Sequence, residues 1–282
     1  MTKFNYLLAF AISCGVLLCS CGNEEAENKN TTETTNEAKE AETTFILPSP
    51  LQIASIFKNS GMGYVAGIGN DFNNESKYTT NISKFIALGV YSGDLAYYSL
   101  NKQKQESINC LNTIRKISGE IGLETVFGNK ELLESFEKNI NNEDSLAYII
   151  AEIQMELDSY LADNEINHLS SVIFASAWVE SMYLGSKSKN DKNKESIANQ
   201  LSQQYLILGN LTKALNKAAQ VNAGFSPLAV EISVINDLFN SFEYLKNKDE
   251  EEVTSTITDE ELTKLTTKIE EVRKKLIEGA IS

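Results

Sequence analysis

The chain has 282 residues, a formal net charge of −14 and 42% hydrophobic residues. So acidic a balance argues against a nucleic-acid partner, because phosphate binding needs basic patches. The length is sufficient for one sizeable hydrophobic core or for two small ones.

The first 20 residues have the pattern of a secretory signal. Lys3 precedes an apolar run over residues 4–18, which is short for a transmembrane helix. The run leads into LCSC at residues 18–21, which resembles a bacterial lipobox: an aliphatic residue, a tolerant position, a small residue and the cysteine that is lipidated. The resemblance implies a lipoprotein signal peptide over residues 1–20 and acyl chains such as palmitate on Cys21. Such a lipid anchors a protein to a membrane without spanning it. The alternative is an ordinary cleaved signal peptide.

Residues 21–44 form an acidic and polar stretch. It carries seven glutamates and two lysines, and apart from three alanines nothing in it is apolar. A segment of this composition cannot bury a core, so we expect a disordered tether ahead of a domain at residues 45–282. The acidic cluster behind the lipidated cysteine is similar to the export signal of surface lipoproteins in Bacteroidota. The resemblance implies a cell-envelope location at the outer membrane, facing the periplasm or the surface.

The remaining sequence predicts an all-α domain, because no alternating strand pattern occurs and the glycine, asparagine and serine clusters fall between helical periods. The longer helical segments indicate a single-domain bundle of about eight antiparallel helices. The segments with a helical period cover residues 50–59, 78–100, 107–119, 122–127, 130–139, 145–163, 166–185, 196–221, 226–245 and 258–279.

Two of these helices are apolar on more than one side, which predicts that they lie at the centre. In residues 83–99 two apolar stripes run along the helix, and Gly89 and Gly93 lie one turn apart, where another backbone can approach closely. The second such helix spans residues 166–185. Both helices carry an acid followed by a tyrosine one turn later. This weak similarity would fit a pseudo-repeat that places the two helices side by side, and chance is the alternative.

Asp94 and Glu180 interrupt these apolar stretches. Buried carboxylates near tyrosines act as general acids, orient ligands, or serve the structure through a tyrosine hydroxyl or an arginine. We favour the structural role and expect both acids to share a buried polar or ligand-binding cluster. Its candidate members are Asp94, Tyr97, Tyr98, Arg115, Trp178, Glu180 and Tyr183.

Several kinds of site are not supported. His168 is the single histidine, so neither a di-iron bundle site nor a four-ligand Cys/His zinc site can form, and we predict no metal and no cofactor. The glycines of residues 61–69 fit no phosphate-loop spacing, so we expect a helix break and an irregular turn. If Cys14 and Cys19 leave with the signal and Cys21 is acylated, Cys110 has no partner for an intramolecular disulfide.

The segment GVYSGDLAYYSLNKQ at residues 89–103, with the lipobox and the tether, resembles the all-helical lipoproteins of Bacteroidota. That resemblance implies no activity. The sequence favours a binding or scaffolding module at the cell envelope, held by its lipid and meeting an envelope protein, and it is more consistent with a non-enzyme. One alternative is a small-molecule-binding or hydrolytic protein using Asp94 and Glu180 in a pocket between the central helices. Another is an accessory subunit of an envelope uptake or secretion complex.

Overall fold

The computed structural model describes residues 47–246 and 256–281. The regular elements within those ranges are all helical, twelve α-helices and two 3-10 segments, which confirms the all-α class. The described residues all belong to one compact unit. The predicted signal peptide at 1–20, the lipidated Cys21 and the tether at 21–44 lie outside the described residues. Within the described ranges, no helix has both the length and the apolar character needed to cross a bilayer.

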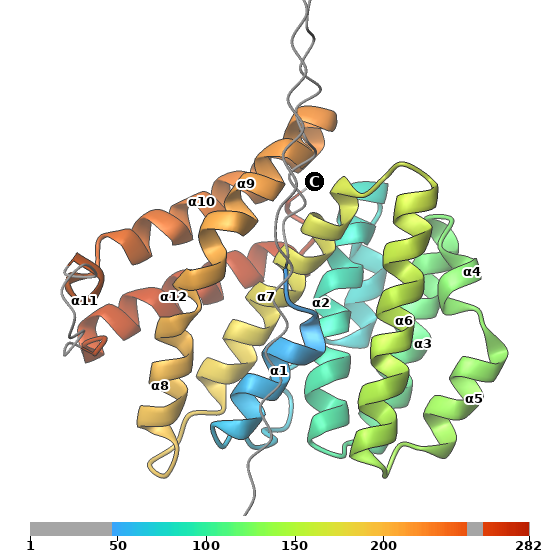
Figure 1. Cartoon of the computed structure of the whole chain (residues 1–282), viewed down its shortest axis with the longest axis horizontal. Helices are drawn as coiled ribbons and strands as arrows, with labels where there is room; N and C mark the ends of the chain where they lie inside the picture. The colour runs from blue at the N-terminus through green and yellow to red at the C-terminus, as the bar shows by residue number, and fades with distance from the viewer. Residues whose placement is uncertain (1–46, 247–255, 282) are drawn as a thin grey trace, which may run out of the picture. The chain divides into compact units, whose positions relative to one another are not determined.

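Figure 1 shows the helices coloured in chain order. Their bounds are α1 Pro50–Asn59, η1 Phe72–Lys77, α2 Asn81–Leu100, α3 Lys104–Glu120, α4 Glu124–Phe127, α5 Lys130–Lys138, α6 Glu143–Asp163, α7 His168–Lys187, α8 Lys194–Gln203, α9 Tyr205–Val221, η2 Ala223–Phe225, α10 Ser226–Asn240, α11 Glu243–Lys246 and α12 Asp259–Ile277.

Local sequence sets several of these boundaries. Ser49 and Gln52 close a capping box at the start of α1, and Thr258 and Glu261 do the same for α12. Such reciprocal hydrogen bonds satisfy backbone donors that the first turn leaves unpaired. Thr80 forms a similar box with Ser83, so α2 begins a few residues later than its apolar period predicts.

The α2–α7 pair forms the centre, as the two apolar helices predict. Figure 1 shows α3, α4, α5 and α6 on one side of this pair and α8 to α12 on the other. A Cβ added to Gly89 would lie 2.1 Å from the Ile173 carbonyl oxygen, and one added to Gly93 would lie 3.1 Å from the Ala177 carbonyl oxygen. The predicted close crossing at these glycines is confirmed.

The same contacts correct the expected antiparallel arrangement for this pair. Gly89 meets Ile173 and Gly93, one turn later, meets Ala177, so α2 and α7 run in the same direction along their contact. The chain between them, α3 to α6, provides the return path that a parallel pair requires. The offset aligns Asp94 on α2 with Glu180 on α7, because Glu180 also packs against Gly93.

The described residues form twelve α-helices from ten predicted helical segments, because two of those segments are divided. Residues 196–221 contain a turn at Gln204, whose side chain accepts a hydrogen bond from the indole nitrogen of Trp178 at 3.2 Å. Residues 226–245 are interrupted near Ser241, whose hydroxyl donates back to the Leu238 carbonyl at 2.6 Å. The Ser241 bond runs from a side chain to the backbone, and bonds of this kind compete with continuation of a helix.

Candidate functional site

The central helices hold a sealed polar cluster, here called the acid–arginine cluster: Asp94 of α2, Glu180 of α7 and Arg273 of α12. Both acids have no exposed surface, and Arg273 is 7% exposed. The Arg273 guanidinium donates from Nε to Glu180 Oε2 and from Nη2 to Glu180 Oε1, each at 2.8 Å. A two-point pair of this kind is the strong form of a charge-assisted hydrogen bond, and it fixes orientation as well as distance.

Arg273 also has neighbours beyond Glu180. Its guanidinium carbon lies 3.9 Å from the centre of the Tyr183 ring, and Nη2 donates to the Ile68 carbonyl at 3.0 Å. Burial lowers the pKa of Arg273, but the Glu180 carboxylate outweighs it and the pKa is raised above its ordinary value. Arg273 therefore stays charged and joins α12 to α7 and to the chain before α2.

Asp94 is less well compensated than Glu180. Its Oδ2 accepts a hydrogen bond from the Asn70 backbone N–H at 3.1 Å, while its Oδ1 receives none from the described residues. Burial raises the pKa of Asp94 well above its ordinary value, and the nearby charge of Glu180 raises it further. An isolated buried carboxylate avoids its desolvation cost by taking up a proton. Of the two acids, Asp94 is therefore the one whose surroundings favour the protonated form.

The segment over residues 61–71 covers the cluster, and we call it the covering loop. Its Val65 N–H donates to the Tyr97 hydroxyl at 2.7 Å. The Asn70 side chain donates to the Tyr78 hydroxyl at 3.1 Å. At Gly69 a Cβ would lie 2.1 Å from the Tyr98 hydroxyl oxygen and 2.9 Å from Asp94 Oδ1, so only glycine allows this approach. The irregular turn expected here is confirmed. Its backbone donates a hydrogen bond to the buried acid Asp94.

Arg115, a candidate member of the cluster and one of the expected alternatives as a partner for the acids, lies outside it. Arg115 is exposed on α3, because the inward face of that helix is taken by the apolar stripe that includes Ile114 and Ile117. Arg273 takes its place. A signal was present in the sequence, since Arg273 follows Ile269 by one turn and so lies on the apolar face of α12.

The other predicted members divide between the cluster and the core. Tyr183 stacks on Arg273, and Tyr97 and Tyr98 lie under the covering loop. Trp178 is fully buried and its hydrogen bond goes to Gln204 rather than to either acid. Apart from Arg115 and Trp178, the structure thus brings the predicted residues together.

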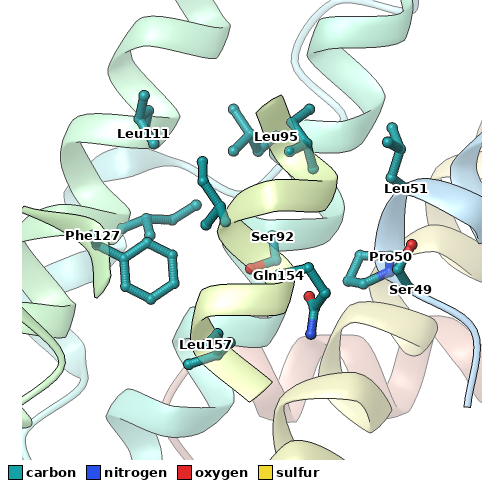
Figure 2. Close-up of a pocket in the computed structure, with 12 residues that line it drawn as sticks. Ser49, Pro50, Leu51, Ser92, Leu95, Leu111, Phe127, Gln154 and Leu157 are labelled. Atoms are coloured by element: carbon teal, nitrogen blue, oxygen red, sulfur yellow. The ribbon is translucent and has the colours of Figure 1, made fainter. Parts of the chain in front are cut away.

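A separate cavity of about 40 Å³ lies between α1, α2, α3, α4 and α6. Figure 2 shows its apolar walls, which include Leu95, Leu111 and Phe127. One water molecule needs roughly 10–15 Å³ of cavity volume, so the space suits a few waters or a small apolar group. Neither Asp94 nor Glu180 lines it.

The polar side chains at this cavity are already engaged. The Ser92 hydroxyl donates to the Leu88 carbonyl at 2.7 Å, and the Gln154 amide donates to Asp158 at 3.2 Å. Ligand sites place a few convergent polar groups among apolar walls. The donors of these two side chains are therefore already used within the protein.

In the described part of the chain, no three histidine, cysteine, aspartate or glutamate residues gather in a way that would hold a metal ion. The Cys110 thiol is buried and donates to the Tyr91 carbonyl at 3.1 Å. Burial raises the pKa of this thiol well above its ordinary value, which keeps it protonated and unreactive.

Comparison with protein-family models, with curated proteins and with solved structures finds no match.

Proposed function

We propose that this protein is a lipid-anchored cell-envelope protein that acts as a binding or scaffolding module. The observation that carries the proposal is the closure of the acid–arginine cluster. Glu180 has both carboxylate oxygens bound by Arg273, and the covering loop lies over Asp94. Acids held in this way join helices and are closed to a substrate.

The anchor is part of the proposal. The lipobox-like residues and the acidic stretch behind Cys21 support attachment to the outer membrane by acyl chains, as in the Bacteroidota surface lipoproteins that this region resembles. Two acyl chains give stable binding where one gives only marginal binding. The tether would hold the helical domain away from the lipid surface.

The outer face of α6 supports a role in binding another protein. Tyr148 is 68% exposed and Met155 is 61% exposed, and the two are separated by seven residues on one side of the helix. Aromatic and methionine side chains are enriched at protein interfaces. We propose this face as the contact for an envelope protein, which includes the case of an accessory subunit in an uptake or secretion complex.

A hydrolytic or small-molecule role is the weaker proposal. It requires Asp94 and Glu180 to line an accessible pocket, whereas both are fully buried and the cavity shown in Figure 2 is lined by neither.

The test is reciprocal capture from detergent-solubilised envelopes after crosslinking in intact cells. The double variant Tyr148→Ser with Met155→Ser should lose a partner that the wild type retains. The matched control, Val230→Ser with Val234→Ser, removes a second exposed apolar pair on α10 and should keep that partner. Equal capture by all three proteins would contradict the α6 face. A copurifying small molecule that disappears in Glu180→Gln, with no protein partner found, would overturn the scaffolding function.

A further inference from the structure

The acid–arginine cluster holds two carboxyl groups and one guanidinium in an interior closed to water. With both acids ionised it would carry one unbalanced negative charge, which is costly to bury. Glu180 already faces the guanidinium at two points, whereas Asp94 has only the Asn70 backbone N–H. The proton that would neutralise the cluster therefore belongs on Asp94.

The unpartnered oxygen of Asp94 supports this assignment. As part of a carboxylate, Oδ1 is an acceptor that no described donor reaches. Once protonated it becomes a donor, and the Glu180 side chain lies close enough to act on Asp94 through hydrogen bonding as well as through its charge. A proton shared between the two acids satisfies the oxygen that ionisation leaves unsatisfied.

We propose that Asp94 is a proton-controlled latch, which holds the covering loop on the α2–α7 pair while it is protonated and releases the loop when the proton is lost. The loop depends on the cluster through the Asn70 N–H on Asp94 and the Ile68 carbonyl on Arg273. Loss of the proton places a second negative charge beside Glu180, and admission of water by opening the loop relieves it. This latch is independent of the partner proposed above.

Several charged and polar groups around Asp94 influence its pKa. Glu180 raises its pKa, while Arg273 and the Asn70 N–H lower it, and burial remains the largest influence. The other groups act on one another in the same interior and include no further charge at neutral pH, since burial raises the pKa of each above its ordinary value. They are Tyr78, Tyr91, Tyr97, Tyr98 and Cys110.

The sign of the pH dependence follows from the direction of the Asp94 shift. The closed state binds the proton more tightly than the open state, where an aspartate titrates near about 3.9. Opening therefore releases a proton. The opening equilibrium should rise with pH, by up to about tenfold per unit, from about pH 4 to the pKa of the closed form, and should then level off.

The experiment is amide hydrogen exchange of the full chain between pH 5 and pH 8, followed over residues 61–71. The Asn70 amide is the most direct probe because it donates to Asp94. Asp94→Asn keeps an acceptor for that amide and a donor in place of the proton, so it should hold the loop closed at every pH. Division of the wild-type rate by the variant rate at each pH cancels the intrinsic pH dependence of exchange.

We expect this ratio to grow as the pH rises, and Asp237→Asn, which removes an exposed acid on α10, to match the wild type. A ratio that stays constant from pH 5 to pH 8 would overturn the latch. If Asp94→Asn fails to fold, carbon-13 NMR of the Asp94 carboxyl in the wild type decides the matter. Titration above the ordinary aspartate range supports the latch, and titration at or below it refutes the proposal.

Discussion

The Arg273 guanidinium makes three contacts at once, to Glu180, to the Ile68 carbonyl and to the Tyr183 ring. A buried ion pair gains little over well-packed apolar residues, because desolvation offsets the attraction between the charges. Removal of one partner is different, since it leaves the other charge buried and unmatched. At the residue scale the largest effects should therefore come from single substitutions in this pair.

Arg273→Met should destabilise the fold by about 3–5 kcal/mol, because it leaves the Glu180 carboxylate without its partner. Addition of Glu180→Gln should restore part of the loss, and urea unfolding of both single variants and the double variant measures the coupling. Arg115→Met is the matched control. It removes an exposed arginine and should change the unfolding free energy by less than about 0.5 kcal/mol. An equal loss for the two arginine variants would contradict the role of Arg273.

The folding stability should also depend on Asp94 through pH. Its folded pKa is raised, first by burial and then by Glu180, so the stabilising effect of its proton is complete below the unfolded value of about 3.9. That contribution is lost as the pH rises through the folded pKa. In Asp94→Asn the midpoint of urea unfolding should fall less between pH 5 and pH 8 than in the wild type. Parallel pH profiles for the two proteins would show that Asp94 folds with its charge.

Among the elements, the parallel contact of α2 with α7 positions the cluster. Gly89 and Gly93 let the two backbones approach, and the alignment that results places Asp94 beside Glu180. The sequence predicted this contact because small residues interrupt an otherwise bulky apolar surface. It did not predict the direction of α7, because periodicity reports which face of a helix is buried and carries no information on its neighbour's orientation.

Alanine substitutions at two glycines should distinguish the effect of the close helix crossing on stability from the effect of helix propensity. In Gly89→Ala the added Cβ would lie 2.1 Å from the Ile173 carbonyl, and overpacking of this kind costs about 1–3 kcal/mol. In Gly209→Ala on α9 nothing lies within 4 Å of the added Cβ, so the change should stabilise the protein by about 0.5–1 kcal/mol. Thermal unfolding measures both. The same sign for the two variants would contradict the close crossing.

At the scale of the whole molecule, local patterns in the sequence predicted more than distant contacts did. The apolar stripes predicted an all-α domain with two central helices, and the acids that interrupt those stripes predicted a buried cluster. Arg273 was missed because 93 residues separate it from Glu180 and no local pattern joins them. For the covering loop the sequence predicts only a helix break and a turn, because backbone groups that bind a buried acid leave no signature in side-chain composition.

For the whole molecule, we predict that attachment to the membrane depends on Cys21. In Cys21→Ser the thiol that would accept the acyl chains is absent, so the protein should move from the membrane fraction to the soluble fraction and lose palmitate label. Cys19→Ser is the matched control, because it changes the tolerant position of the lipobox-like segment and leaves Cys21 in place. It should remain membrane-bound. Each buried methylene of an acyl chain contributes roughly 0.8 kcal/mol, so loss of the lipid should give a nearly complete shift between fractions. Membrane-bound and labelled Cys21→Ser would refute acylation at this cysteine, and loss of label in Cys19→Ser alone would assign the acyl chains to Cys19.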